Sequence, residues 1–188
     1  MRAEARTRPM IDVLVPGDSL VREVALVAAF AVITALFARI TLPVPWSLVP
    51  ITGQTFAVLL AGALLGSKRG ALSQMAYLGI GATGVPLWFS ATTKLGVAGI
   101  IGPSGGFLVG FIPMAFVVGF LAERGWDRRF WTAVAAMLIG EVVLYIFGVS
   151  WMSRFSNVIA YLYNNALKGW PWLASMRSSA PRRIQASR

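Results

Sequence analysis

Long apolar stretches, separated by short polar or proline-rich breaks, make up most of the chain. The first stretch ends before Pro43 and Pro45, because proline cannot continue a helix and restricts the residue before it. The last is the weakest, since Arg154 and three asparagines interrupt it. Six segments predict an all-α membrane protein with six transmembrane helices: 24–40, 52–66, 71–80, 105–121, 131–148 and 151–167.

The second and third segments are too short to cross a membrane alone. A helix over residues 52–66 rises only ~22 Å, against an apolar membrane core of about 30 Å. Their ends must be completed by loops at membrane depth, which survive only when they are buried in protein or line a cavity. Residues 81–106 are rich in Gly and Pro yet still apolar. We therefore expect a partly buried outer loop between the third and fourth helices.

Composition supports a membrane protein. Of the 188 residues, 57% are hydrophobic and only 13% are charged, whereas soluble domains have about 25% charged residues. This length leaves no room for a separate soluble domain of ordinary size. We predict one integral membrane domain, with a cytoplasmic N-terminal segment over 1–22, a membrane region over 23–167 and a basic C-terminal tail over 168–188.

The distribution of basic residues predicts the orientation. With the N-terminus inside and six spans, 14 of the 17 Lys and Arg residues fall on the inner side. The outer side holds Arg39, Lys94 and Arg154. This bias is typical of a multi-pass plasma-membrane protein, here with both termini cytoplasmic. The basic residues lie between apolar blocks and no recognition module accompanies them, so we expect no nucleic-acid binding.

The chain has no Cys and no His. Disulfides, thiol chemistry, a histidine base and metal binding by imidazole or thiolate are therefore excluded. With one acid inside the apolar segments, too few catalytic groups remain for an enzyme. We expect neither enzymatic activity nor a cofactor.

Polar residues stand at the start of the second segment, in the stretch "PITGQTF" over 50–56. Gln54 and Thr55 offer donors and acceptors suited to a ligand amide or urea. The alternative is a helix start, with Thr52 or Thr55 as the cap, but capping does not account for Gln54. Lys94, the one lysine on the outer side, either pairs with a ligand carboxylate or is solvated.

Residues 102–106, "GPSGG", precede the fourth segment. Gly105 and Gly106 allow a ligand to approach the backbone closely, and a helix N-terminus favours an anion. The alternative is a tight turn that leads into the helix. The stretch lacks the Lys-Ser/Thr pair of a nucleotide-binding loop, so it does not indicate ATP.

Glu141 is the only acid inside an apolar segment, and such a residue is functional by default. The alternative is a packing role, either paired with a basic side chain or protonated. Tyr145 of the same segment completes the candidate ligand-binding set. Trp88 lies at the proposed outer boundary, either as a membrane anchor or as an aromatic wall for an apolar ligand.

Small residues recur at helical spacing in the first segment. Ala25 pairs with Ala29, and Ala31 pairs with Ala35. Such faces let two helices approach closely. They serve either packing within the chain or docking of a separate membrane subunit.

Taken together, four stretches of this sequence resemble the BioY family, the biotin-binding S components of energy-coupling factor transporters. The resemblance covers roughly residues 24–151. It implies six transmembrane helices. It also implies that biotin is held near the outer surface, under the loop between the first and second transmembrane helices. It further implies an Ala-xxx-Ala face that docks a transmembrane coupling subunit, with two ATPase subunits as further partners. Ala25 and Ala29 match this face best, and Ala31 and Ala35 come second. The stretches are "VPITGQTFAVLLAGALLG", "RGALSQMAYLGIGATGVPLW", "GIIGPSGGFLVGF" and "GVSW".

The tail departs from the family pattern. Family members usually end the sixth span with Pro-Phe-x-Pro-Gly-Asp-x-x-Lys, whereas residues 169–188 contain neither Asp nor Lys. No tail residue is therefore predicted to contact ligand. A shifted reading frame over 160–188 is one hypothesis, and a DNA sequence with no Asp-x-x-Lys in any frame would exclude it.

The expected function is capture and uptake of biotin as the substrate-specific component of such a transporter. The alternative is a self-sufficient secondary transporter or channel for biotin or another small amphipathic solute. Such proteins often have inverted repeats and a coupling acid. No clear repeat is visible, and Glu141 is the sole candidate for coupling.

Overall fold

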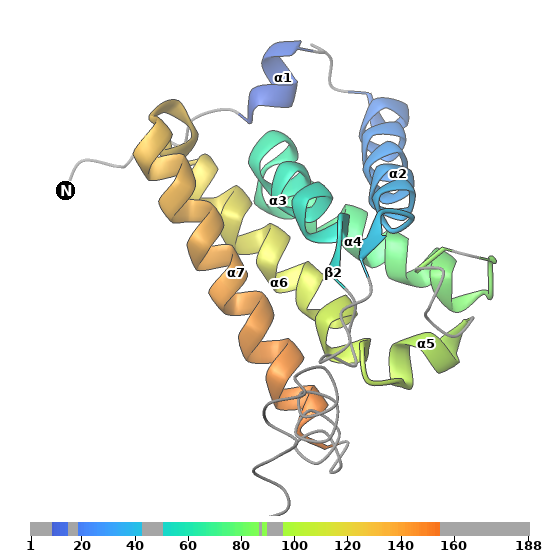
Figure 1. Ribbon diagram of the computed structural model, residues 1–188. Helices are drawn as coiled ribbons and strands as arrows, with labels where there is room; N and C mark the ends of the chain where they lie inside the picture. The colour runs from blue at the N-terminus through green and yellow to red at the C-terminus, as the bar shows by residue number, and fades with distance from the viewer. Residues whose placement is uncertain (1–8, 15–18, 43–50, 87, 90–95, 155–188) are drawn as a thin grey trace, which may run out of the picture.

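Apolar runs bounded by Ser, Gly and Pro form most of the helices. The computed structural model describes residues 9–14, 19–42, 51–86, 88–89 and 96–154 (Figure 1). The helices in these ranges are α1 (Met10–Leu14), α2 (Leu20–Phe37), α3 (Gln54–Leu65), α4 (Ser67–Ala82), α5 (Val97–Ile101), α6 (Gly105–Ala122), the 3-10 helix η1 (Trp126–Arg128) and α7 (Phe130–Met152). Two short strands, β1 (Thr41–Leu42) and β2 (Ile51–Thr52), complete the described elements.

Helices α2, α3, α4, α6 and α7 overlap the first five predicted segments, with ends that differ by up to four residues. Among the described residues, α2, α6 and α7 are long and apolar enough to cross a membrane. Helix α3 has only 12 residues and α4 has 16. The predicted start of the sixth segment, residues 151–152, belongs to α7, and beyond residue 154 the segment lies outside the described residues, so six spans remain a prediction.

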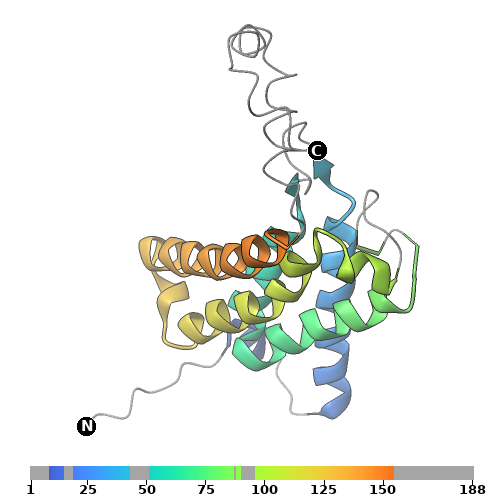
Figure 2. The ribbon, with the colours of Figure 1, turned by 90° about the horizontal axis from the view of Figure 1, so that it is seen from below.

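Helix α6 lies at the centre of the bundle. It has α7 on one side and α3 and α4 on the other, while α2 packs against α4 (Figures 1 and 2). Glycine allows the closest of these contacts, because a Cβ at Gly119 would lie 2.7 Å from the carbonyl oxygen of Gly66. Helices in membranes gain most of their contact energy from such close packing.

Helix α2, which matches the first predicted segment, begins at Leu20, four residues earlier than predicted. Ser19 caps α2, and its Oγ accepts a hydrogen bond from the backbone N–H of Arg22 at 3.3 Å. A serine at this position satisfies one of the free N–H groups of the first turn. The charged residues Arg22 and Glu23 occupy the first turn of α2, so the apolar stretch in the sequence begins only after that turn.

The two short strands were not predicted, although the described fold is mostly helical as expected. They pair antiparallel, with Thr41 opposite Thr52 and Leu42 opposite Ile51. The backbone N–H of Gly53 then donates to the carbonyl of Ile40 at 2.9 Å. This ladder joins the end of α2 to the start of α3. A two-residue strand is too short for an alternating pattern, so the sequence carries no signal for it.

An ionic network holds α1 against the ends of α2 and α4. Asp12 accepts from Arg22 at 2.9 Å and from Arg69 at 2.7 Å, and Glu23 pairs with Arg69 as well. Ile11 is buried in an apolar cluster formed with side chains of α2 and α3. Salt bridges and one buried side chain therefore anchor this short helix, which the sequence did not predict.

The network predicts a pH dependence that Asp12→Asn removes. Burial alone would raise the pKa of the Asp12 carboxyl, but hydrogen bonds and positive charge from Arg22 and Arg69 hold it below its ordinary 3.8. A carboxyl with a lowered pKa stabilises the fold above its ordinary pKa and loses this effect as pH falls through the lowered value. In detergent, Asp12→Asn should melt below the native chain at pH 7, and the difference should vanish at acidic pH. A difference that persists unchanged in acid would contradict this role.

Candidate ligand-binding site

Gln54 is the first residue of α3 and is only 4% exposed. Its Nε2 donates to the Tyr77 hydroxyl and, at 2.6 Å, to the backbone carbonyl of Phe89. Its Oε1 accepts from the Thr52 hydroxyl at 2.9 Å. Both amide hydrogens are thus engaged within the chain, while the second lone pair of Oε1 has no partner among the described residues. Gln54 ties β2, α4 and the segment after α4 together.

An aromatic cluster surrounds this amide. Tyr77 is fully buried in α4. Trp88 stacks on it with ring centroids 6.0 Å apart, and Phe89 meets it edge-on at 5.6 Å. The Trp88 Nε1 also donates to the Tyr77 carbonyl at 2.8 Å. Trp88 therefore packs on α4 while remaining partly exposed, and the candidates Gln54 and Trp88 belong to one cluster.

Sequence reasoning missed Tyr77 and Phe89. Both lie in apolar surroundings, where an aromatic residue usually indicates packing. The one available signal was the unexplained Gln54, since a buried amide needs partners. Nothing in the local pattern identified those partners.

A second polar cluster, also missed, joins α2 to α4. Gln74 is fully buried, and its Nε2 donates to the Ser73 hydroxyl at 3.1 Å and to the Thr34 hydroxyl at 3.4 Å. The Thr34 hydroxyl in turn donates to the carbonyl of Phe30 at 2.8 Å. Polar contacts between helices hold them together where apolar side chains have no preference for one another over lipid.

The two glycines of the predicted anion site lie where helices meet. A Cβ at Gly105 would lie 2.7 Å from the carbonyl carbon of Ile100, and one at Gly106 would lie 2.8 Å from the carbonyl oxygen of Phe147. The Trp151 Nε1 donates to the Gly102 carbonyl at 3.1 Å and fixes α7 to this turn. These contacts favour the tight-turn alternative, and a ligand role for either glycine stays a prediction.

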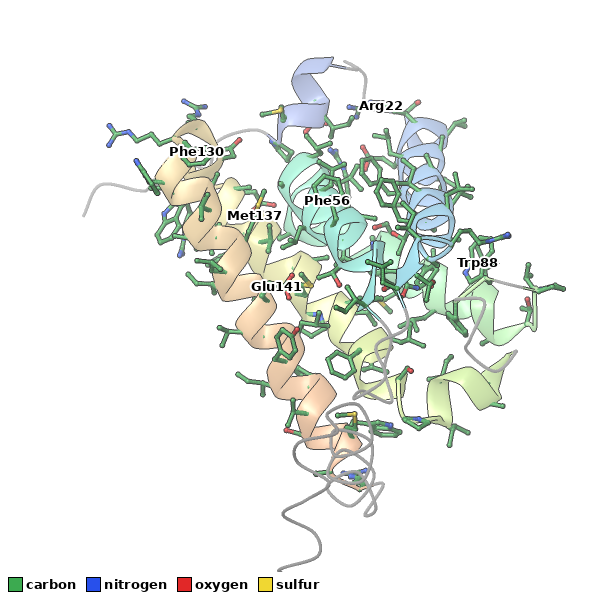
Figure 3. The ribbon with its side chains drawn as sticks, viewed as in Figure 1. Arg22, Phe56, Trp88, Phe130, Met137 and Glu141 are labelled. Atoms are coloured by element: carbon green, nitrogen blue, oxygen red, sulfur yellow. The ribbon has the colours of Figure 1, made fainter. Side chains whose placement is uncertain are left out.

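The remaining ligand candidates are dispersed. Glu141 is half-buried near the middle of α7 (Figure 3), and it makes no ion pair or hydrogen bond with another described residue. Tyr145 is mostly exposed, with its ring edge-on to Phe107 at 6.0 Å. Thr55 is half-buried beside Gln54, and Lys94 lies outside the described residues.

Within the described ranges, no cluster of three or more His, Cys, Asp or Glu side chains could hold a metal ion. The arrangement around Gln54 is instead a packed cluster of three aromatic residues around an amide, in which only Trp88 is partly exposed.

The two alanine faces of α2 differ in burial. Ala31 and Ala35 are buried against the other helices of this chain. Ala25 and Ala29 are exposed. One face therefore serves packing within the chain, and only the other is open to a separate subunit.

The comparisons with known proteins agree with this architecture. A family model described as "BioY family" matches residues 5–178. The "Probable biotin transporter BioY" of Pyrococcus horikoshii is 39% identical over 134 residues, 71% of this chain and 76% of that protein. Its namesake from Lysinibacillus sphaericus is 36% identical over 133 residues, 71% of this chain and 65% of that protein. The match thus spans just under two thirds of the Lysinibacillus protein.

One solved structure shares the fold. It is the crystal structure of the S-component for biotin from an ECF-type ABC transporter, with a TM-score of 0.67 and 24% sequence identity. The superposition covers 80% of this chain and 84% of that one. The family model spans all the elements described above, and by that match the chain belongs to the BioY family.

Proposed function

We propose that this chain captures biotin and carries it across the membrane as the substrate-specific component of an energy-coupling factor transporter. The match to the BioY family over residues 5–178 carries the proposal. The proposal includes six spans, a plasma-membrane location, cytoplasmic termini and a partly buried outer loop. The strong inward bias of Lys and Arg supports this orientation.

The cluster around Gln54 suits the chemistry of biotin. The ligand has a ureido ring, an apolar thiophane ring and a carboxylate. Because both Gln54 amide hydrogens are engaged, Gln54 acts on the ligand mainly by holding Tyr77 and the Trp88–Phe89 pair in place. Gln54 is only 4% exposed, so a bond from a ureido N–H to its second Oε1 lone pair would require the cluster to open. Lys94, Gly105 and Gly106 remain candidates for the carboxylate.

The exposed Ala25–Ala29 face is the proposed docking site for a transmembrane coupling subunit, which in turn binds two ATPases. Ala25→Leu with Ala29→Leu should weaken this docking about tenfold, because the larger side chains keep the helices apart. Uptake should fall while biotin binding is unchanged. Measurements are co-purification with the coupling subunit and uptake of labelled biotin. The control is Ala98→Leu, at an exposed position on α5. Equal losses in both variants would contradict the assignment.

The alternative is a self-sufficient secondary transporter, favoured by the half-buried Glu141 on α7. Uptake by cells that express the chain with and without its energising subunits separates the two functions. Dependence on the ATPases supports the S-component function. Uptake without them that Glu141→Gln abolishes, with biotin binding intact, would support the alternative.

A further inference from the structure

The junction of η1 and α7 carries a basic and aromatic patch, which we define as Arg128, Arg129, Phe130 and Trp131. Both arginines are exposed. Phe130 is 73% exposed and Trp131 is 79% exposed, and their rings meet edge-on at 5.3 Å. Figure 3 shows Phe130 at the same end of the molecule as α1. Large aromatic side chains left this open need an apolar environment next to them.

Local contacts hold the patch in place. The Thr132 hydroxyl shares its one hydrogen between the carbonyls of Trp126 and Arg129, at 2.7 and 2.9 Å. These contacts fix the backbone of η1 onto the first turn of α7. The backbone positions that carry the two arginines and the two aromatic rings are therefore held next to one another.

The charge of the patch is not neutralised from within the described chain. Neither Arg128 nor Arg129 forms an ion pair there. The carboxylate of Glu123 instead accepts from the backbone N–H of Ser67 at 2.8 Å and from its hydroxyl at 2.7 Å. Asp127 is the one acid between residues 124 and 131, against three arginines. The segment thus retains a net positive charge.

We propose that this patch binds the headgroup of an anionic phospholipid of the phosphatidylglycerol type. Guanidinium groups form paired hydrogen bonds with phosphate oxygens. Trp rings settle at the boundary between headgroups and acyl chains, and an adjacent Phe ring adds apolar surface that inserts there. The two halves match a lipid whose phosphate lies directly above its chains. This site is separate from biotin capture and does not depend on it.

The opposite end of α7 provides a matched contrast. Arg154 is exposed there too, but its guanidinium lies 5.3 Å from the centre of the Trp151 ring. Trp151 is itself half-buried and donates to the Gly102 carbonyl. This end of α7 therefore has one arginine instead of two, and its tryptophan is held by a hydrogen bond instead of being exposed.

The test titrates the full-length chain, purified in zwitterionic detergent, with phosphatidylglycerol and with phosphatidylcholine of identical chains. The melting temperature reports lipid binding. Phosphatidylglycerol should stabilise the native chain more than phosphatidylcholine. Arg128→Gln with Arg129→Gln should weaken its apparent affinity about 30-fold, from the usual contribution of a basic residue at an anionic membrane. Arg154→Gln should change the affinity less than about twofold.

Three outcomes would overturn the proposal. They are equal stabilisation by both lipids, equal losses in the double variant and Arg154→Gln, and a double variant that keeps its lipid affinity but no longer co-purifies with the coupling subunit. The last would assign the patch to a protein partner. If the double glutamine variant melts below the native chain without added lipid, the test uses Arg128→Lys with Arg129→Lys in its place. This variant keeps the charge and loses the paired geometry, so its lipid affinity should be intermediate.

Discussion

Gln54→Ala is expected to lower the melting temperature of the purified chain by about 5 °C or more and to weaken biotin binding at least about tenfold. The substitution leaves the Tyr77 hydroxyl, the Phe89 carbonyl and the Thr52 hydroxyl without their common partner. Each buried polar group left unsatisfied costs about 1–3 kcal/mol. Binding falls because the aromatic cluster loses the amide that positions it.

Two further variants test how much of the loss of stability comes from the hydrogen bonds of Gln54. Tyr77→Phe removes one partner of Gln54 and should cause a smaller loss of stability. Thr55→Val alters the neighbouring half-buried residue, for which the structure shows no hydrogen bond to a described side chain, and should change the melting temperature little. If Gln54→Ala abolishes binding without lowering the melting temperature, Gln54 contacts biotin directly and its structural role is wrong.

Gly106→Ala is expected to destabilise the chain by about 3 kcal/mol or more, or to prevent folding. The added Cβ would lie 2.8 Å from the Phe147 carbonyl oxygen and closer still to the Trp151 Cβ. Backbone atoms cannot move aside as a flexible side chain can, so α6 and α7 must separate. Thermal melting in detergent without biotin measures this effect apart from any ligand contact.

Gly79→Ala is the matched control for that variant. Gly79 lies within α4, and a Cβ there would have nothing within 4 Å. Alanine in a helix interior is more stable than glycine by about 0.5–1 kcal/mol, so this variant should melt at the native temperature or slightly above. Similar melting of Gly106→Ala and the native chain would contradict the close α6–α7 contact.

The long helices were predictable because their signal is local. An uninterrupted apolar run indicates a helix in lipid whatever lies beside it, and α6 begins at Gly105 as the sequence indicates. The short elements were not predictable. A five-residue helix such as α1 is unstable alone, and it depends on Asp12 and Ile11 contacting residues far along the chain.

In the candidate site, too, residues with a local sequence signal were predictable and residues defined by distant contacts were not. Gln54 was recognisable because an amide in an apolar stretch is anomalous, yet its partners Tyr77 and Phe89 lie 23 and 35 residues away. The two alanine pairs of α2 are identical in spacing. The packing of α2 against α3 and α4 buries Ala31 and leaves Ala25 exposed. A helix that is apolar on every side does not indicate which face turns inward.

Equilibrium binding of labelled biotin to the purified chain, without any partner subunit, tests the central claim most directly. We expect saturable binding of one biotin per chain, displaced by unlabelled biotin and weakened at least about tenfold by Gln54→Ala. A chain that melts cooperatively, and is therefore folded, but shows no saturable binding would contradict biotin capture by this protein.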